Sequence, residues 1–305
     1  MRIFDLHADI AYDVYLKKLK GIDHELKNVH LKKLQKANCG CVCMASFFEG
    51  KESWEEMQAM VLEIRKQIDE CDAFHLVLKA NDFHDHKINV IMSVEGMCGI
   101  DRDVEKRITW LYDQGVRLAT LTWNDQNALA TGVAGDAQRG LSELGIKALQ
   151  VMSELKMIVD VSHANEQTFW DIMKYDVKVI ASHSNCYTLC DHRRNLKDEQ
   201  IKALLNKKAI IGMNCFPPFV SKEDTSLQAF IKHMEYLKAM DPNLSCIAFG
   251  FDFMDYFEEG TLDLDDFHDI CDVHKLLTAM KQVFSEAEIK KIAYQNAINY
   301  FNQYL

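Results

Sequence analysis

Short β-type runs recur along the chain, and amphipathic helical stretches separate them. The stretches 54–70 and 142–155 both place apolar side chains at three- and four-residue spacing, the pattern of a helix that covers one face of a sheet. Strands that alternate with helices are typical of a parallel sheet with helices packed on it. Eight strands are predicted, namely Ile3–Ala8, Cys39–Phe48, Asn89–Val94, Val116–Thr122, Met157–Val161, Val177–Ser182, Ala209–Asn214 and Cys246–Gly250.

The number of β/α units favours a barrel. Eight units in 305 residues fit a (β/α)8 TIM-type barrel, an α/β fold that typically needs about 250 residues. A doubly wound sheet would normally carry a Gly-rich phosphate turn after its first strand, whereas this strand leads into Asp5-Leu6-His7-Ala8-Asp9. The chain has only three prolines and no low-complexity linker, so we expect a single barrel domain over residues 1–305.

Charge and cysteine content disfavour several kinds of partner. Thirty-five basic and 46 acidic side chains give a net charge of −11, which disfavours binding to nucleic acid or to an anionic membrane. The N-terminus is not an apolar signal segment, and no run approaches the roughly 18 apolar residues of a membrane span. Ten cysteines are scattered among apolar runs in a chain too large to need disulfides. We therefore expect reduced thiols, a cytoplasmic location, and neither a nucleic-acid nor a membrane partner.

Ligand-type side chains stand at the ends of several predicted strands. In a barrel, the carboxyl ends of the strands converge on the face where active sites lie. Histidines and carboxylates together are the ligand types that suit zinc. The residues concerned are His7 and Asp9 at the first strand, Glu95 at the third, His163 at the fifth, His183 at the sixth and Asp252 after the eighth.

Two metal ions would use these residues more economically than one. The i, i+2 spacing of His7 and Asp9 turns both side chains to the same face of an extended strand, where they can bind one ion. His163 and His183 would bind the second ion, and Glu95 would bridge the two through its two oxygens. With a bridging hydroxide, two Zn²⁺ ions would keep a net positive charge that polarises a carbonyl and stabilises an oxyanion.

Each residue also has a plain structural interpretation. A single histidine at a strand end is more often a hydrogen-bonded structural residue than a ligand, and Glu95 alone could cap a helix. Five strand ends that all carry ligand-type residues favour the metal site. Asp5 and Asp160 could orient ligating imidazoles or accept ordinary buried hydrogen bonds. The segment His84-Asp85-His86 looks like a metal-binding pair, but its polar neighbours indicate a solvated loop.

Several stretches of the chain also reproduce a known series of motifs in order. The most specific are Gly140-Leu141-Ser142-Glu143-Leu144-Gly145, Met157-Ile158-Val159-Asp160-Val161-Ser162-His163 and Thr168-Phe169-Trp170-Asp171; the others are Asp5-x-His7-x-Asp9, Val94-Glu95-Gly96, Ser182-His183-Ser184, Arg193-Arg194-Asn195 and Gly250-x-Asp252-Phe253. On these stretches the chain resembles the membrane (renal) dipeptidase family of zinc-dependent peptidases, within the metallo-dependent amidohydrolases with (β/α)8 barrels. The resemblance covers most of the chain.

The resemblance implies roles for these residues. It implies that Arg194 holds the terminal carboxylate of the substrate, a task suited to a planar fork of donors. It implies that Asp252 shuttles a proton between a metal-bridged hydroxide and the leaving amine, and that the protein is a homodimer. Without the resemblance, Arg194 would be taken for a surface charge on a loop and Asp252 for the cap of a turn. The implied zinc ligands are His7, Asp9 and Glu95 for one ion and Glu95, His163 and His183 for the other.

One position departs from the family pattern. Relatives carry a histidine in an LTH-type motif after the fourth strand, where it helps to polarise the scissile carbonyl, but this chain reads Leu121-Thr122-Trp123-Asn124. The indole N–H of Trp123 can donate a hydrogen bond but cannot take up a charge. Either the metal ions supply most of the oxyanion stabilisation, or Asn124 or Asn127 assists, or activity is reduced. We count Trp123 and Asn124 among the expected substrate-binding residues.

The expected function is hydrolysis of the peptide bond of dipeptides, with two zinc ions per chain. The catalytic residues would be Asp252 and Glu95, and loops 216–219 and 254–257 would shape the side-chain pockets. The alternatives are another metal-dependent amidohydrolase or lactonase, and a non-catalytic metal-binding relative. Arg194 and Asp252 favour the dipeptidase, because a lactonase needs no carboxylate clamp and a binding protein needs no proton shuttle.

Overall fold

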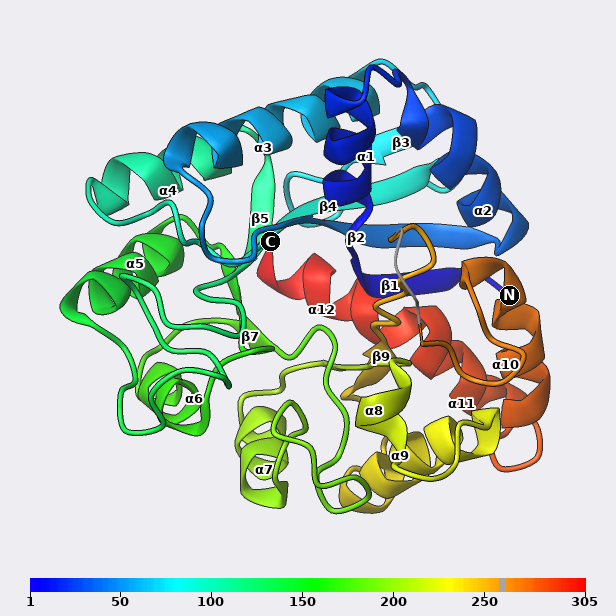
Figure 1. Ribbon diagram of the computed structural model, residues 1–305. Coiled ribbons are helices and arrows are strands. Elements are labelled where there is room, and N and C mark those ends of the chain that lie inside the picture. Colours follow the sequence, from blue (N-terminus) through cyan, green and yellow to red (C-terminus); the bar gives the residue numbers. More distant parts are fainter. Residues whose placement is uncertain (258–261) are drawn as a thin grey trace.

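The computed structural model describes residues 1–257 and 262–305, and in this part of the chain nine parallel strands form one sheet (Figure 1). The strands are β1 Ile3–Ala8, β2 Cys39–Phe47, β3 Phe74–Leu76, β4 Ile88–Glu95, β5 Val116–Thr120, β6 Ile158–Asp160, β7 Val179–Ile180, β8 Ile211–Met213 and β9 Ile247–Phe249. The α-helices are α1 Ile10–Leu19, α2 Leu31–Lys36, α3 Trp54–Asp69, α4 Val104–Asp113, α5 Glu143–Glu154, α6 Glu166–Met173, α7 Asp198–Asn206, α8 Pro217–Val220, α9 Leu227–Met240, α10 Val273–Met280, α11 Glu286–Lys290 and α12 Asn296–Tyr304. Three further helical turns are η1 Leu26–His30, η2 Ile270–Asp272 and η3 Lys291–Gln295.

The sheet curls into a barrel, which confirms the predicted (β/α)8 fold. The strand order is β7-β6-β5-β4-β2-β1-β9-β8, and its two end strands meet where Ala181 pairs with Ile211. The amide of Ala181 donates to the carbonyl of Ile210 over 2.9 Å, and the amide of Gly212 donates back to the carbonyl of Ala181 over 2.8 Å. The helices surround this ring of strands (Figure 1).

The prediction of eight strands missed β3. This three-residue strand pairs with the first half of β4, whereas β5 pairs with the second half of β4. It therefore extends the amino-terminal end of the barrel without adding a position to the ring. Three residues are too few to show an alternating pattern of apolar and polar side chains.

Several strands are shorter than predicted, because buried side chains take over the backbone donors at their ends. The strand expected over residues 177–182 is confined to β7, and the amide of Ser182 donates to Asp160 Oδ1 over 3.0 Å. After β9, the amide of Phe251 donates to Asp5 Oδ1 over 3.0 Å. Of the two interpretations of Asp5 and Asp160, buried hydrogen bonding to the backbone is therefore present for both.

Serine side chains cap the first turns of α3 and α5. Ser53 accepts a hydrogen bond from the amide of Glu56, whose side chain binds the Ser53 amide in return, and α3 starts at the next residue. Ser142 accepts from the amide of Gly145 and so starts α5. These caps satisfy amides that the first helical turn leaves without a partner. The apolar faces of both helices lie against the sheet, as predicted.

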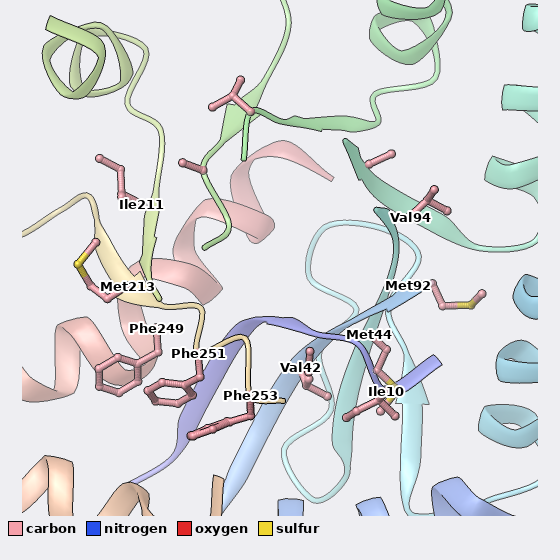
Figure 2. Close-up of a cluster of buried hydrophobic side chains, with 14 of the residues drawn as sticks. Ile10, Val42, Met44, Met92, Val94, Ile211, Met213, Phe249, Phe251 and Phe253 are labelled. Atoms are coloured by element: carbon pink, nitrogen blue, oxygen red, sulfur yellow. The ribbon is translucent and has the colours of Figure 1, made fainter. Parts of the chain in front are cut away.

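Two apolar layers hold the barrel together. Outward-facing side chains such as Val42, Met44, Met92 and Val94 from β2 and β4 pack under the surrounding helices (Figure 2). Inward-facing side chains fill the barrel itself, and α12 closes it with Ala297, Tyr300 and Phe301 (Figure 1). This inner cluster contains Ile210, just before β8, and the strand residues Phe4, Leu6, Cys41, Cys43, Ile91, Leu118, Ile158, Ile180 and Ala248.

The remaining sequence expectations concern cysteines, the histidine loop and the membrane. All ten cysteines are free, as predicted. The segment His84-Asp85-His86 is exposed before β4, where the amide of His84 donates to Asn89 Oδ1 over 2.7 Å. Within the described residues, no helix has the length and apolar character needed to cross a bilayer.

Because α12 closes the barrel with Phe301, we expect this side chain to contribute strongly to the free energy of unfolding. Phe301 is fully buried and stacks on Phe4 at 5.4 Å between ring centroids. Phe301→Ala should therefore lower the free energy of unfolding by about 3–5 kcal/mol, because it leaves a cavity inside the barrel. Urea denaturation followed by circular dichroism measures this. Gln303→Ala, an exposed change in the same helix, should cost less than about 0.5 kcal/mol. Equal losses of unfolding free energy in both variants would contradict this role of Phe301.

Candidate active site

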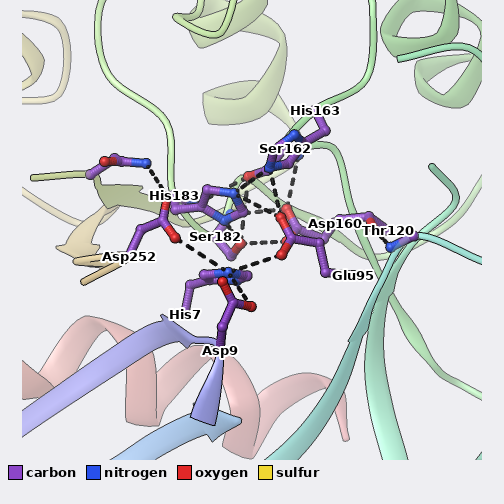
Figure 3. Close-up of polar contacts among 12 residues, drawn as sticks. His7, Asp9, Glu95, Thr120, Asp160, Ser162, His163, Ser182, His183 and Asp252 are labelled. Atoms are coloured by element: carbon purple, nitrogen blue, oxygen red, sulfur yellow. Dashed lines mark hydrogen bonds and ion pairs between the residues drawn. The ribbon is translucent and has the colours of Figure 1, made fainter. Parts of the chain in front are cut away.

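The six strand-end residues that the sequence singles out meet at the carboxyl end of the barrel (Figure 3). Glu95, at the end of β4, lies among the three histidines, and all of these side chains are buried. They lie in β1 or directly after it, at the end of β4, and in the segments that follow β6, β7 and β9. The barrel therefore brings together residues up to 245 positions apart in the sequence (252 − 7). The residues are His7, Asp9, Glu95, His163, His183 and Asp252.

The two oxygens of Glu95 face two different groups. Glu95 Oε2 lies 3.3 Å from His7 Nε2. Glu95 Oε1 lies 2.6 Å from His163 Nε2 and 3.3 Å from His183 Nε2. The Nε2 atoms of His163 and His183 are themselves 2.8 Å apart. Three imidazole nitrogens therefore converge on one carboxylate, an arrangement that metal ligands adopt.

A second set of oxygens lies on the other side of His7. Its Nε2 is 3.4 Å from Asp9 Oδ1 and 3.7 Å from Asp252 Oδ1. Among the described residues, neither His7 Nε2 nor Asp9 Oδ1 has a hydrogen-bond partner, although both atoms are buried. Buried polar atoms without partners are costly, so these two atoms fit a site that is completed by a bound cation.

Neighbouring side chains orient two of the histidines. His163 Nδ1 lies 2.9 Å from Asn124 Oδ1, and His183 Nδ1 lies 2.6 Å from Ser182 Oγ. The Ser182 hydroxyl in turn donates to Asp160. A donor at Nδ1 leaves the lone pair on Nε2 of His163 free for a ligand. Asp160 thus acts on His183 through Ser182, whereas Asp5 accepts hydrogen bonds from the backbone amides of His7, over 3.2 Å, and Phe251.

The surroundings of His163 and His183 keep both rings neutral. Burial and the nearby Arg194 cation lower the pKa of His163 to about 4. Burial and His7 hold the pKa of His183 well below its ordinary value. Burial by itself would raise the pKa of Glu95, but His7 and His163 outweigh it and hold that pKa well below the usual range. His163, His183 and Glu95 thus have the protonation states that metal ligation requires. At His7, burial would lower the pKa, but Glu95 and Asp9 outweigh it and raise that pKa well above its ordinary value, so a metal ion bound there would displace a proton.

The other two carboxyl groups behave differently. Burial, followed by repulsion from Glu95, raises the pKa of Asp9 to about 8. Burial raises the pKa of Asp252 to about 6, with attraction to His7 opposing it. Both groups lie in a region with more carboxylates than cations, and a bound cation would favour their ionised forms. The donor set therefore fits the divalent metal that the sequence predicts.

Two site residues hold a strained backbone. His163 and Asp252 have φ angles of 69° and 59°, in the left-handed region that residues other than glycine rarely adopt. Such conformations persist where the surrounding structure imposes them, often at functional sites. For Asp252, the imposing contacts are its amide, which donates to the carbonyl of His7 over 3.3 Å, and Asn214 Nδ2, which donates to Asp252 Oδ2 over 2.9 Å.

Arg194 is buried, contrary to the surface position that its loop alone would suggest. Its Nη2 donates to the carbonyl of His183 over 3.4 Å, and its guanidinium carbon lies 5.4 Å from the centre of the Phe219 ring. Its Nε is buried without a hydrogen-bond partner among the described residues, and burial lowers its pKa. A buried guanidinium with an unused donor is suited to bind an anion such as a carboxylate.

A cavity of about 350 Å³ adjoins these groups. Trp123 and Asn124 line it. The Asn127 side chain instead makes hydrogen bonds within its own loop, donating to the carbonyl of Leu121 and accepting from the amides of Leu129 and Ala130. A second cavity of about 520 Å³ shares His163 and Arg194 with the first. The residues around the first cavity are Asp9, Phe47, Glu49, Glu95, Trp123, Asn124, His163, Arg194, Phe216, Phe219, Asp252, Met254 and Phe257.

Sequence reasoning missed two residues that position the site. Asn214 holds Asp252, and Ser182 connects Asp160 to His183. Asn214 ends a predicted strand, so the same strand-end signal could have found it. An amide and a hydroxyl neither titrate nor are typical zinc ligands, so residue type alone did not single out Asn214 or Ser182.

Sequence comparisons identify relatives of the chain. The profile of the membrane dipeptidase family (peptidase family M19) matches residues 1–304. A protein from Klebsiella pneumoniae, described as an uncharacterized protein in the pqqA 5′ region, is 29% identical over 228 residues, which cover 70% of this chain and 80% of that protein. The uncharacterized dipeptidase C965.12 of Schizosaccharomyces pombe is 28% identical over 253 residues, which cover 72% of this chain and 61% of that protein.

Solved structures share the fold. A metallo peptidase from Rhodobacter sphaeroides, crystallised with a phosphinate mimic of the dipeptide L-Ala-D-Ala, has a TM-score of 0.86 at 18% identity and covers 100% of this chain and 99% of its own. The probable dipeptidase PvdM from Pseudomonas aeruginosa has a TM-score of 0.83 at 14% identity and covers 99% and 95%. Because the family profile matches nearly the whole chain, the protein belongs to the membrane dipeptidase family, peptidase family M19, and is a hydrolase of the metallo-dipeptidase class.

Proposed function

We propose that the protein hydrolyses the peptide bond of dipeptides with two zinc ions held at the carboxyl end of the barrel. The observation that carries this proposal is Glu95, one of whose oxygens faces His7 while the other faces His163 and His183. Beside it lie a cavity and one buried arginine. The ligand of the Rhodobacter sphaeroides enzyme, a phosphinate mimic of a dipeptide, supports the choice of substrate.

These contacts support the ligand sets that the sequence predicts. His7, Asp9 and Glu95 would hold one ion, and His163 and His183 would hold the other together with the second oxygen of Glu95. When bound, two zinc ions would activate water and polarise the scissile carbonyl.

The chain's own residues would bind the substrate and move its proton. Asp252 Oδ1 points toward His7 while Asn214 holds the other oxygen, so one carboxylate oxygen is free to take a proton from water and to pass it to the leaving amine. Arg194 would hold the C-terminal carboxylate of the substrate, and the short span from this guanidinium to the catalytic centre would limit the substrate to two residues.

The alternative activities use fewer of these features. A lactone or a simple amide offers no carboxylate to a buried guanidinium, so Arg194 would remain an uncompensated buried charge, which is costly. A non-catalytic metal-binding protein would have no use for the left-handed Asp252 and its Asn214 partner.

We also propose a cytoplasmic location, since ten unpaired cysteines are typical of a reducing compartment. The homodimer that the resemblance implies stays a prediction.

The first test of the metal arrangement is Glu95→Gln. An amide cannot bridge two cations as a carboxylate does, so bound zinc should fall by at least one ion per chain and dipeptide hydrolysis should be lost. Inductively coupled plasma mass spectrometry after dialysis against zinc measures the metal. The matched control is Glu105→Gln, an exposed carboxylate on α4. Full zinc content together with unchanged turnover in Glu95→Gln would rule out bridging.

The second test concerns the carboxylate clamp. Arg194→Ala should lower kcat/KM for dipeptides on the order of 10²-fold, through loss of a charge-assisted pair worth about 1.5–3 kcal/mol. Arg194→Lys should recover only part of this, because an ammonium group lacks the planar fork. Arg193→Ala removes the neighbouring exposed arginine and serves as the control. If the wild-type enzyme cleaves C-terminally amidated dipeptides as well as free acids, the clamp assignment is wrong.

The third test addresses Trp123. Trp123→Phe should cost less than about tenfold in kcat, or about 1.4 kcal/mol, because we expect the metal ions to supply most of the oxyanion stabilisation. Trp123→His should raise kcat if the tryptophan is a deficit, since a single oxyanion donor is worth about 2.7–4 kcal/mol elsewhere. Steady-state kinetics of the wild type and both variants, at equal metal content, measure these changes in kcat. A loss of about a hundredfold in a folded, metal-loaded Trp123→Phe protein would mean that the indole N–H donates to the oxyanion.

A further inference from the structure

One side of the substrate cavity is an aromatic wall. Phe47, the last residue of β2, contacts Trp123 edge to face at 5.1 Å between centroids. Tyr12 lies against both Phe47 and Phe257, at 5.2 Å and 5.4 Å. Phe47, Trp123 and Phe257 all line the cavity, so a continuous apolar surface borders the group of metal ligands on the side of Asp9.

The loop that carries Phe257 is fixed from outside the cavity. Its Asp255 pairs with Lys33 of α2, and the same lysine lies 3.2 Å from Asp269. Together with the stacking of Phe257 on Tyr12, this pairing holds Phe257 in place before any ligand arrives. A preformed apolar surface binds an apolar group without the cost of ordering side chains.

Another part of the cavity lining contains the proposed carboxylate clamp. Phe216 and Phe219 contact each other at 5.0 Å, and Phe219 lies against the Arg194 guanidinium. A dipeptide held by Arg194 would therefore keep its C-terminal residue beside Phe216 and Phe219. Its N-terminal residue would then lie beside Phe47, Trp123 and Phe257.

We infer that the enzyme selects dipeptides whose N-terminal residue has a large apolar or aromatic side chain, bound by Phe47, Trp123 and Phe257. The inference rests on the proposed dipeptidase function. Among the described lining residues, Arg194 is the only arginine or lysine and the substrate carboxylate occupies it, so an acidic N-terminal side chain finds no partner. A basic side chain could pair with Glu49, which is exposed at the cavity edge, because the other lining carboxylates, Asp9, Glu95 and Asp252, belong to the proposed catalytic centre.

The expected preference is moderate. Burying a phenylalanine side chain instead of a methyl group in such a pocket favours the larger substrate by about 10- to 100-fold in kcat/KM. Wild-type protein loaded with zinc should thus cleave Phe-Gly and Leu-Gly faster than Ala-Gly, and Ala-Gly faster than Asp-Gly.

Variants in each wall separate the two ends of the substrate. Phe257→Ala, at a half-buried position, should reduce the Phe-Gly to Ala-Gly ratio at least fivefold, and Phe47→Leu should reduce it in the same direction with less risk to folding. Phe216→Ala should instead reduce the Gly-Phe to Gly-Ala ratio. Leu62→Ala, an exposed change on α3, is the control and should keep both ratios. Calorimetric binding of phosphinate analogues of Phe-Gly and Ala-Gly gives a readout that does not depend on turnover.

The kinetic results test the side-chain preference and the proposed dipeptidase function separately. Cleavage of Ala-Gly as fast as Phe-Gly, or faster cleavage of Lys-Gly than of either, would overturn the inference while leaving the dipeptidase function intact. An unchanged Phe-Gly to Ala-Gly ratio in both Phe257→Ala and Phe47→Leu would overturn the assignment of the wall. No cleavage of any dipeptide by the zinc-loaded protein would overturn the proposed function and the inference together.

Discussion

The carboxylate of Glu95 is the contact on which the site depends, because it meets imidazoles from three different parts of the chain. One oxygen lies near His7 of β1, and the other lies near His163 and His183, which follow β6 and β7. A carboxylate buried in this way is stable only if it is paired with cations or donors. The geometry of the barrel supplies these partners, since the carboxyl ends of parallel strands arranged in a ring point to one centre.

Polar side chains that surround the proposed ligands hold this centre in position. Asp5 and Asp160 accept amides where strands end, so they fix the backbone from which the ligands project. Asn214 and Ser182 then orient Asp252 and His183. The left-handed backbone at Asp252 is tolerated because the contacts of its amide with His7 and of its side chain with Asn214 impose it. Preorganisation of this kind lets a site stabilise developing charge without first rearranging.

Much of the site could be predicted from the sequence because its signal is local. The end of a buried strand is visible in the sequence, and a histidine or a carboxylate at that point is unusual enough to indicate a metal site. The barrel followed from the alternation of strands and helices, although β3 was too short to detect and the ends of β7 were set by Asp160, which lies on another strand. Arg194 needed the family resemblance, because nothing near it in the sequence predicts that it is buried.

The sequence by itself determined the fold class and the identity of the ligand-type residues, since each depends on residue type and short-range spacing. The departure at Trp123 came from the family resemblance. Only the tertiary structure decided which oxygen of Glu95 meets which histidine, that Asn214 holds Asp252, and that Phe47 and Phe257 join Trp123 in one wall around Tyr12. Phe47 and Phe257 are 210 positions apart, counted as 257 − 47. Their contact with a common partner arises only when the barrel closes and brings the loop after β9 beside the end of β2, and no local pattern in either segment encodes that approach.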